Sequence, residues 1–185
     1  MKMNIQLKAS PISNNSYTFR ICLTGVLCAM AIAGRILLWV APNIQPVTVL
    51  IILISVYIGL YEGIASAIIV PVVTNLLMGS LGLWTVYQAI AWAFIGLLSW
   101  LFFRKNKNSM SLFVWSIASA YIYGTIVDAC SWQVFSSGTG LAGFLSYRLT
   151  SILFDTYHAI GNGVFIWVFL PVLRKFLEKR SSTKE

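Results

Sequence analysis

The sequence PVTVLIILISVYIGLYEGIASAIIVPVV occupies residues 46–73 and decides how many helices the chain forms. It is apolar almost throughout, and its only charged residue is Glu62. A single long helix would hold this carboxylate at membrane depth, which is energetically costly. Two helices, at about 46–61 and 63–79, would instead place Glu62 at a turn. The sequence therefore predicts a tight helical hairpin.

Further apolar stretches flank this hairpin and bring the expected number of helices to six. They lie at about 19–40, 86–103, 112–131 and 149–173. Most of the six approach the roughly 17–25 residues that are needed to cross a bilayer core. Pro71 predicts a kink within its helix, because its ring removes a backbone hydrogen bond.

The composition excludes a water-soluble protein. The chain has 185 residues, of which 58% are hydrophobic and only 10% are charged, with a mean hydropathy of +0.82. Soluble domains average about 25% charged residues. We expect an all-α integral membrane protein, a compact bundle of six transmembrane helices that forms a single domain over residues 1–185. A polar lead-in at 1–18 and a tail at 174–185 would lie in the cytoplasm.

The distribution of Lys and Arg predicts this orientation, because cytoplasmic segments of membrane proteins are rich in these residues. With the N-terminus inside, 11 of the 13 basic residues are cytoplasmic, and only Arg35 and Arg148 fall toward the outside. The net charge of +8 is therefore a topology signal. A nucleic-acid interface is the weaker interpretation, since the charges are spread over separate segments. The cytoplasmic set is Lys2, Lys8, Arg20, Arg104, Lys105, Lys107, Arg174, Lys175, Lys179, Arg180 and Lys184.

A cleaved signal peptide is an alternative interpretation of the first apolar stretch. Ala29-Met30-Ala31 resembles a small-residue cleavage site. The apolar stretch continues to Val40, however, which is too long for the core of a signal peptide. We therefore expect a retained membrane helix.

Polar and aromatic residues gather at the ends of the predicted helices that face outward. An aromatic-lined cavity with a few polar groups is typical of a small-molecule site. The candidate substrate-binding residues are Asn43, Gln45, Thr48, Asn75, Trp84, Thr85, Gln88, Trp92, Asp128, Trp132, Asp155, His158 and Asn162.

Asp155, His158 and Asn162 are spaced i, i+3, i+7 and share one helix face. An ionisable group within the membrane indicates a functional site by default, because its burial is costly. The alternative is an internal ion pair of Asp155 with Arg148 or Arg35. Asp128 and Arg35 lie at comparable depths, and we expect any pair between them to be structural.

Two features of the outer side have alternative interpretations. Trp84 suits the aromatic belt at a membrane interface, whereas Trp92 is deeper and shares a face with Gln88. Residues 132–147 contain the run Ser-Ser-Gly-Thr-Gly and are the longest non-apolar connection. We expect them to form a loop, which acts as a lid or is simply a flexible connector.

Gly25, Ala29 and Ala33 form a stripe of small side chains on the first helix. Such stripes let another membrane helix approach closely. The stripe is interpreted either as internal packing or as a docking face for a separate membrane subunit.

The sequence contains no catalytic or metal-binding motif. It has one histidine, no Gly-rich phosphate loop and no nucleophile elbow. Cys22, Cys28 and Cys130 lie in apolar stretches without metal-ligand spacing, and we expect them to be reduced packing residues. No enzyme activity, no resident cofactor and no metal are therefore expected.

Three pieces of the sequence resemble the substrate-binding S components of energy-coupling factor vitamin transporters. They are Asn43-Ile44-Gln45-Pro46-Val47-Thr48, Gly82-Leu83-Trp84-Thr85-Val86-Tyr87-Gln88 leading into Ala91-Trp92-Ala93-Phe94-Ile95-Gly96, and the Ala29-x-x-x-Ala33 pair. The resemblance covers nearly the whole chain. It implies a six-helix subunit of a bacterial cell membrane that binds one vitamin in an outward-facing pocket.

The resemblance also implies partners. The subunit would dock through Ala29 and Ala33 on a transmembrane coupling subunit, which associates with two cytoplasmic ATPases. It would then topple and release the vitamin inside.

The motifs look most like S components assigned to cobalamin, with pantothenate or another small vitamin as the alternative substrate. His158 is the only imidazole available as an axial cobalt ligand, a role that we do not expect it to have. Two other functions remain open, a stand-alone ion-coupled carrier with Asp155 and His158 as a proton relay, and an intramembrane enzyme. Carriers more often contain two pseudo-symmetric halves, and we find none.

Overall fold

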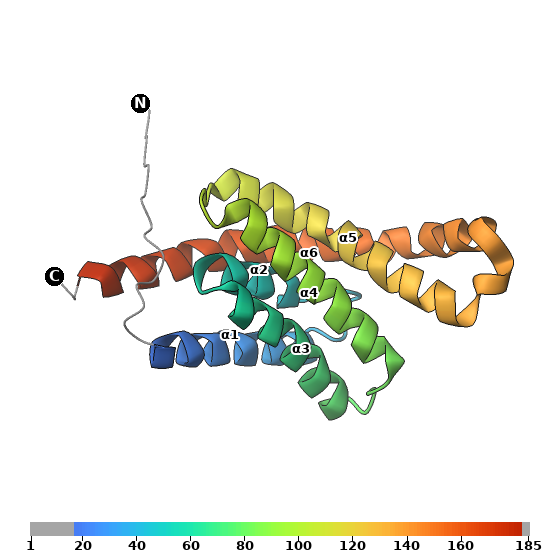
Figure 1. Cartoon of the computed structure of the whole chain (residues 1–185), viewed down its shortest axis with the longest axis horizontal. Coiled ribbons are helices and arrows are strands. Elements are labelled where there is room, and N and C mark those ends of the chain that lie inside the picture. The colour runs from blue at the N-terminus through green and yellow to red at the C-terminus, as the bar shows by residue number, and fades with distance from the viewer. Residues whose placement is uncertain (1–16, 183–185) are drawn as a thin grey trace.

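The computed structural model describes residues 17–182, and over this range the chain is all-helical, without strands (Figure 1). Expectations for residues 1–16 and 183–185, including Lys2, Lys8 and Lys184, lie outside the described residues. The helices are α1 (Tyr17–Leu37), α2 (Val47–Tyr57), α3 (Leu60–Leu77), α4 (Leu83–Phe103), α5 (Ser109–Phe135), a short 3-10 helix η1 (Ser137–Thr139) and α6 (Gly140–Ser182).

Helix α2 lies at the centre of the bundle. Every residue from Val47 to Ile58 is buried, and α2 packs against each of the other five α-helices. A helix that is apolar on all sides can be stable only in such a position. At 1.5 Å per residue, α2 is about 16 Å long, whereas the bilayer core is about 30 Å thick. The helix expected at 46–61 is therefore shorter than a full membrane crossing.

The other five α-helices of the described range are long and apolar enough to cross a membrane. Large hydrophobic side chains such as Trp167, Phe102 and Leu76 are exposed on their outer surfaces. An apolar outer surface of this kind is consistent with a multi-pass membrane protein, in which lipid is the solvent.

The expected break between the second and third helices is confirmed, although it occurs three residues earlier than predicted. Helix α2 ends before Ile58 and Gly59, and Glu62 lies in the first turn of α3. There the helix dipole favours a negative charge. Glu62 also forms an ion pair with Arg20 of α1, with an N–O distance of 2.7 Å. Helix α3 continues through Pro71 to Leu77, and a kink there stays a prediction.

Gly63 brings α3 into close contact with α2. A Cβ atom added at Gly63 would overlap the Ser55 hydroxyl group and lie 3.1 Å from the Ser55 Cα atom. The backbones of the two helices therefore approach more closely than any other residue at position 63 would allow.

We predict that Gly63→Ala lowers the free energy of unfolding by about 1–3 kcal/mol, the usual cost of overpacking a core. Gly25→Ala is the matched control, because an added Cβ there has no atom within 4 Å. Stability of the control should be unchanged or slightly higher, since alanine favours a helix over glycine. Unfolding of the purified variants in detergent measures both effects. Equal stability of the two variants would contradict the prediction.

The segment at 132–147 is not a loop, and the hypothesis of a lid was wrong. Helix α5 continues to Phe135, and α6 begins at Gly140. Only four residues, 136–139, connect the helices, and three of them form η1. Trp132 packs edge-to-face on Phe144 across the turn, with 5.7 Å between ring centroids. The result is a helical hairpin that projects beyond the ends of α3 and α4 (Figure 1).

Packing between α5 and α6 explains why the prediction of a loop at 132–147 was wrong. The run Ser-Ser-Gly-Thr-Gly has low helix propensity, but only its middle residues form the turn. The aromatic residues on either side extend α5 and α6 by packing against each other. Tertiary contacts thus override a local composition that is typical of loops.

Helix α1 lies at the edge of the bundle, where it packs mainly against α2 and α3 and contacts α6 through Phe19. Gly25, Ala29 and Ala33 are all exposed. The small-residue stripe therefore faces outward and does not serve internal packing.

The start of α1 and the end of α6 lie at the same end of the molecule (Figure 1). This end, which we call the basic end, also holds Lys107 and Arg174. Phe176 stacks on Phe19 and joins α6 to α1 there, with 6.1 Å between ring centroids. The tail predicted at 174–185 is helical as far as Ser182, and residues 17–18 of the predicted lead-in belong to α1.

The three cysteines are free, as expected. Cys28 is buried, and its thiol donates a hydrogen bond to Ser66 Oγ over 3.1 Å. Cys22 is exposed on α1, so the expectation that it is a packing residue was wrong for this position.

Candidate functional site

Polar side chains from α1, α3 and α4 form one hydrogen-bonded group around Arg35, which we call the Arg35 cluster. Its members are Arg35, Thr74, Asn75, Thr85 and Gln88. The guanidinium donates to Thr74 Oγ1 over 3.0 Å, and to Asn75 Oδ1 and Gln88 Oε1 over 3.1 Å each. The Asn75 amide donates in turn to Thr85 Oγ1 and Gln88 Oε1. Three candidates, Asn75 of α3 and Thr85 and Gln88 of α4, are thus brought together.

Arg35 carries a positive charge that no carboxylate neutralises within residues 17–182. A guanidinium has five N–H donors, and three of them are used in the Arg35 cluster. Its other close neighbour is the ring of Trp92, 5.3 Å from the guanidinium carbon. The pair between Arg35 and Asp128 that the sequence left open does not form, and Asp128 pairs with Arg148 instead. An arginine without a counter-ion at this depth is a binding-site candidate.

A small recess opens beside Arg35, at the end of the bundle opposite the basic end. Its volume is about 170 Å³. Arg35, Asn43, Gln45 and Gln88 supply its polar groups, and the remaining lining residues are Leu38, Trp39, Ala41, Ile44 and Met78. Asn43 adopts a positive φ of 57° and donates to the Phe154 carbonyl over 3.0 Å, which joins this wall to α6.

Thr48 links Trp92 to His158 in a second group, which is fully buried. The Trp92 indole donates to Thr48 Oγ1 over 2.9 Å, and Thr48 Oγ1 lies 2.8 Å from His158 Nε2. His158 Nδ1 has no partner among the described residues. All three side chains have no exposed surface and do not line the recess. This group contacts the Arg35 cluster through Trp92.

Asp128, Arg148, Ser151 and Asp155 form a third group between α5 and α6, the Arg148 cluster. Arg148 pairs with Asp128, and its other terminal nitrogen lies 2.8 Å from Asp155 Oδ2. Ser151 donates to Asp128. The structural alternative for Asp155, an internal pair with Arg148, is therefore present, and Asp128 has the same partner. Contact of either carboxylate with a substrate stays a prediction.

Three candidates lie apart from these groups. Asn162 donates its amide to the Ser116 carbonyl on α5 over 2.8 Å and is fully buried. Trp84 is half exposed, as an interfacial residue would be. Trp132 lies near the tip of the α5–α6 hairpin and donates to Thr139.

Sequence reasoning missed the central role of Arg35. The signal was present, because Arg35 is the only charged residue in the second half of the first apolar stretch, at 19–40. It was interpreted through charge pairing, and a nearby carboxylate was assumed. Thr74 was also missed, since one threonine in an apolar helix carries no distinctive pattern.

No family model, curated protein or solved structure matches the chain. The resemblance to S components therefore depends on the sequence motifs alone, and function has to be argued from the site.

Proposed function

We propose that the chain is the substrate-binding membrane subunit of a vitamin importer of the energy-coupling factor class, and that Arg35 binds an anionic group of the substrate. The observation that carries this proposal is the uncompensated guanidinium beside a polar recess. Asn75 and Gln88 hold it in position. The guanidinium retains the Nε–H and one Nη1–H as charged donors for a carboxylate or a phosphate.

The size of the recess favours a small substrate. Pockets for drug-sized ligands typically measure about 300–1,000 Å³, and this one measures about 170 Å³. A corrinoid is far larger than the recess, so cobalamin would require a wider conformation. Pantothenate, with one carboxylate and a short chain of polar groups, suits the volume and the charge. We therefore favour the small-vitamin alternative over cobalamin.

We propose that the chain crosses a bacterial cell membrane six times, with α2 as a short central passage and both termini in the cytoplasm. Positive charge at the basic end supports this orientation. The recess would then face outward, where an importer captures its substrate.

The exposed stripe on α1 supports a partner within the membrane. Gly25, Ala29 and Ala33 face away from the bundle, and small side chains allow a second helix to approach closely. We propose that a transmembrane coupling subunit docks there and transmits energy from two cytoplasmic ATPases. The chain contains no ATP-binding motif that would replace them.

We predict that Ala29→Trp or Ala33→Trp abolishes vitamin uptake by cells and leaves substrate binding by the purified chain unchanged. An indole on this face would separate the helices that the small residues bring together. Uptake of labelled vitamin and calorimetric titration measure the two effects. The control is Leu101→Trp, which is also exposed but lies on α4, away from the stripe. Loss of binding in the stripe variants would contradict a docking role.

Titration of the purified chain with pantothenate and with cobalamin tests the substrate. Tight binding of pantothenate alone supports the proposal. Binding of cobalamin alone would refute the inference from size and retain the transporter class. If neither vitamin binds, the proposed function fails.

A stand-alone ion-coupled carrier is the second candidate function. Its proposed relay receives little support from the geometry, because Asp155 bonds to Arg148 and His158 bonds to Thr48. Transport by the solitary chain in liposomes, driven by a proton gradient without ATPases, would favour the carrier.

A further inference from the structure

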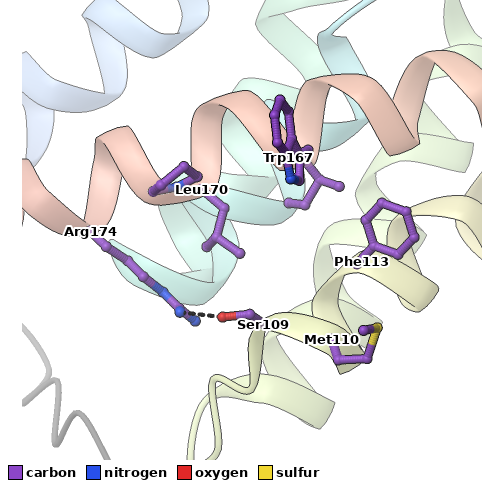
Figure 2. A pocket seen from close by; sticks show the side chains of 8 residues that line it. Ser109, Met110, Phe113, Trp167, Leu170 and Arg174 are labelled. Carbon is purple, nitrogen blue, oxygen red and sulfur yellow. Dashed lines mark hydrogen bonds between the residues drawn. The ribbon is translucent and has the colours of Figure 1, made fainter. Parts of the chain in front are cut away.

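An apolar groove runs along the outer surface between α5 and α6, starting near the basic end. Its first part has a volume of about 450 Å³, and the second has about 730 Å³. Phe113 and Trp167 line both parts, so the two are continuous. Figure 2 shows the first part, with Met110 and Phe113 of α5 facing Trp167 and Leu170 of α6.

The groove begins at a positively charged group and is apolar beyond it. Arg174 lies at the basic end of the groove and donates to Ser109 Oγ over 2.5 Å (Figure 2). It also donates to the Tyr57 hydroxyl over 2.6 Å and to the Lys107 carbonyl. These bonds use three of its five N–H donors, and they point the guanidinium across the mouth of the groove.

This positive charge has no ion-pair partner within the described residues. The Lys107 ammonium lies 4.7 Å from the centre of the Tyr57 ring, beside Arg174. Burial and the neighbouring guanidinium lower the pKa of Lys107. A negative group at the mouth of the groove would therefore be stabilised by both cations.

The groove is long enough to hold an acyl chain across one leaflet of a bilayer. It extends along α5 from Ser109 to Tyr121 and along α6 from Thr156 to Arg174, which is about 18 Å and about 27 Å at 1.5 Å per residue. Half of a bilayer core is about 15 Å thick. An acyl chain with an anionic headgroup fits the apolar walls and the single positively charged end.

We propose that this groove binds an anionic glycerophospholipid from the leaflet at the basic end. The phosphate contacts Arg174, and one acyl chain lies along the groove past Trp167 and Phe113. This site is separate from the Arg35 recess, and it requires only that the helices are embedded in a membrane.

The first test compares two lipids on the delipidated full chain in detergent. Phosphatidylglycerol and phosphatidylcholine with identical acyl chains are added, and bound lipid is counted by native mass spectrometry. Phosphatidylglycerol should bind about fivefold more tightly, since one Lys or Arg near the headgroups contributes about that factor. Arg174→Gln should abolish the preference, and Arg174→Lys should retain it. Equal binding of both lipids to the wild type would overturn the proposal.

Arg104→Gln is the matched control for charge. Arg104 is exposed and lies over the Trp100 ring, 4.6 Å from its centre, and it does not line the groove. The preference for phosphatidylglycerol should survive this change. If Arg104→Gln removes as much of the preference as Arg174→Gln, the charge acts diffusely and the proposed site is wrong.

A second variant tests the groove without altering any charge. Gly163 lines the second part, and an added Cβ has no atom closer than 3.8 Å. Gly163→Leu should therefore fold and fill the space of the acyl chain, which reduces binding of both lipids. Unchanged lipid binding would overturn the proposal. So would a wild-type dimer that Gly163→Leu dissociates, because the occupant would then be a second copy of the chain.

Discussion

Replacing Arg35 with glutamine is expected to weaken pantothenate binding by about a hundredfold, because truncation of one partner in a buried charge pair costs several kcal/mol. Glutamine keeps a polar side chain near Thr74 and Asn75 but removes the charge and the guanidinium donors. Arg35→Lys should lose less, since it retains the charge. Calorimetric titration of the purified variants measures the dissociation constants.

Arg104→Gln is the control for this prediction, since it removes one positive charge at the basic end. Its affinity for pantothenate should equal that of the wild type. Circular dichroism and gel filtration establish that Arg35→Gln is folded. A folded Arg35→Gln variant with wild-type affinity would remove Arg35 from the binding site, whereas loss of folding would indicate a structural role in the Arg35 cluster.

Arg148→Met is expected to lower the free energy of unfolding by about 3 kcal/mol or more, as is usual when one partner of a buried ion pair is removed. The variant would leave Asp128 and Asp155 without a counter-ion, and their side chains are only 10% and 4% exposed. Two carboxylates at one apolar site repel each other and are poorly solvated. Unfolding of the purified chain in increasing denaturant measures the loss.

The triple variant Asp128→Asn, Arg148→Met, Asp155→Asn distinguishes charge from packing. Neutralising all three groups together should restore much of the lost stability, because replacement of a whole buried ion cluster is often nearly neutral. A triple variant that is no more stable than Arg148→Met would show that the guanidinium acts through its packing and its bond to Ser151.

The two clusters carry opposite net charge. The Arg35 cluster has one cation and no acid, while the Arg148 cluster has two acids and one cation. A layer of aromatic rings separates them. Trp92 packs on Tyr123, with 4.9 Å between ring centroids, and Tyr123 packs on His158 at 5.2 Å. This layer explains why Arg35 lacks a carboxylate although one acid is in excess on neighbouring helices.

Local sequence signals predicted the helices more reliably than their ends. The hydropathy of residues 46–73 and the position of Glu62 predicted two helices with a break, and the break exists. The same signals failed at 132–147, where a Ser/Gly-rich run was interpreted as a loop. Helix ends depend on which partner a segment packs against, and this information is not local.

The candidate site was likewise predictable in part from the sequence. Clustering of several polar residues at one end was predictable, because each of them lies in the half of its own helix that is farther from the basic end. The partners of the charges were not predictable. Arg35 bonds to residues on α3 and α4, and Arg148 joins acids on α5 and α6. Which partners each arginine contacts depends on how the helices are rotated about their axes. It also depends on the distances between segments that are far apart in the sequence.

Hydropathy and charge act residue by residue, and local sequence therefore specifies an all-helical, apolar chain with a basic end and an end rich in neutral polar groups. The tertiary structure alone decided that α2 is a short, fully buried helix, that the supposed lid is a helical hairpin, and that Arg35 has no counter-ion. The physical reason is that burial and ion pairing are properties of neighbours in space. Those neighbours are set by the packing of all six helices together.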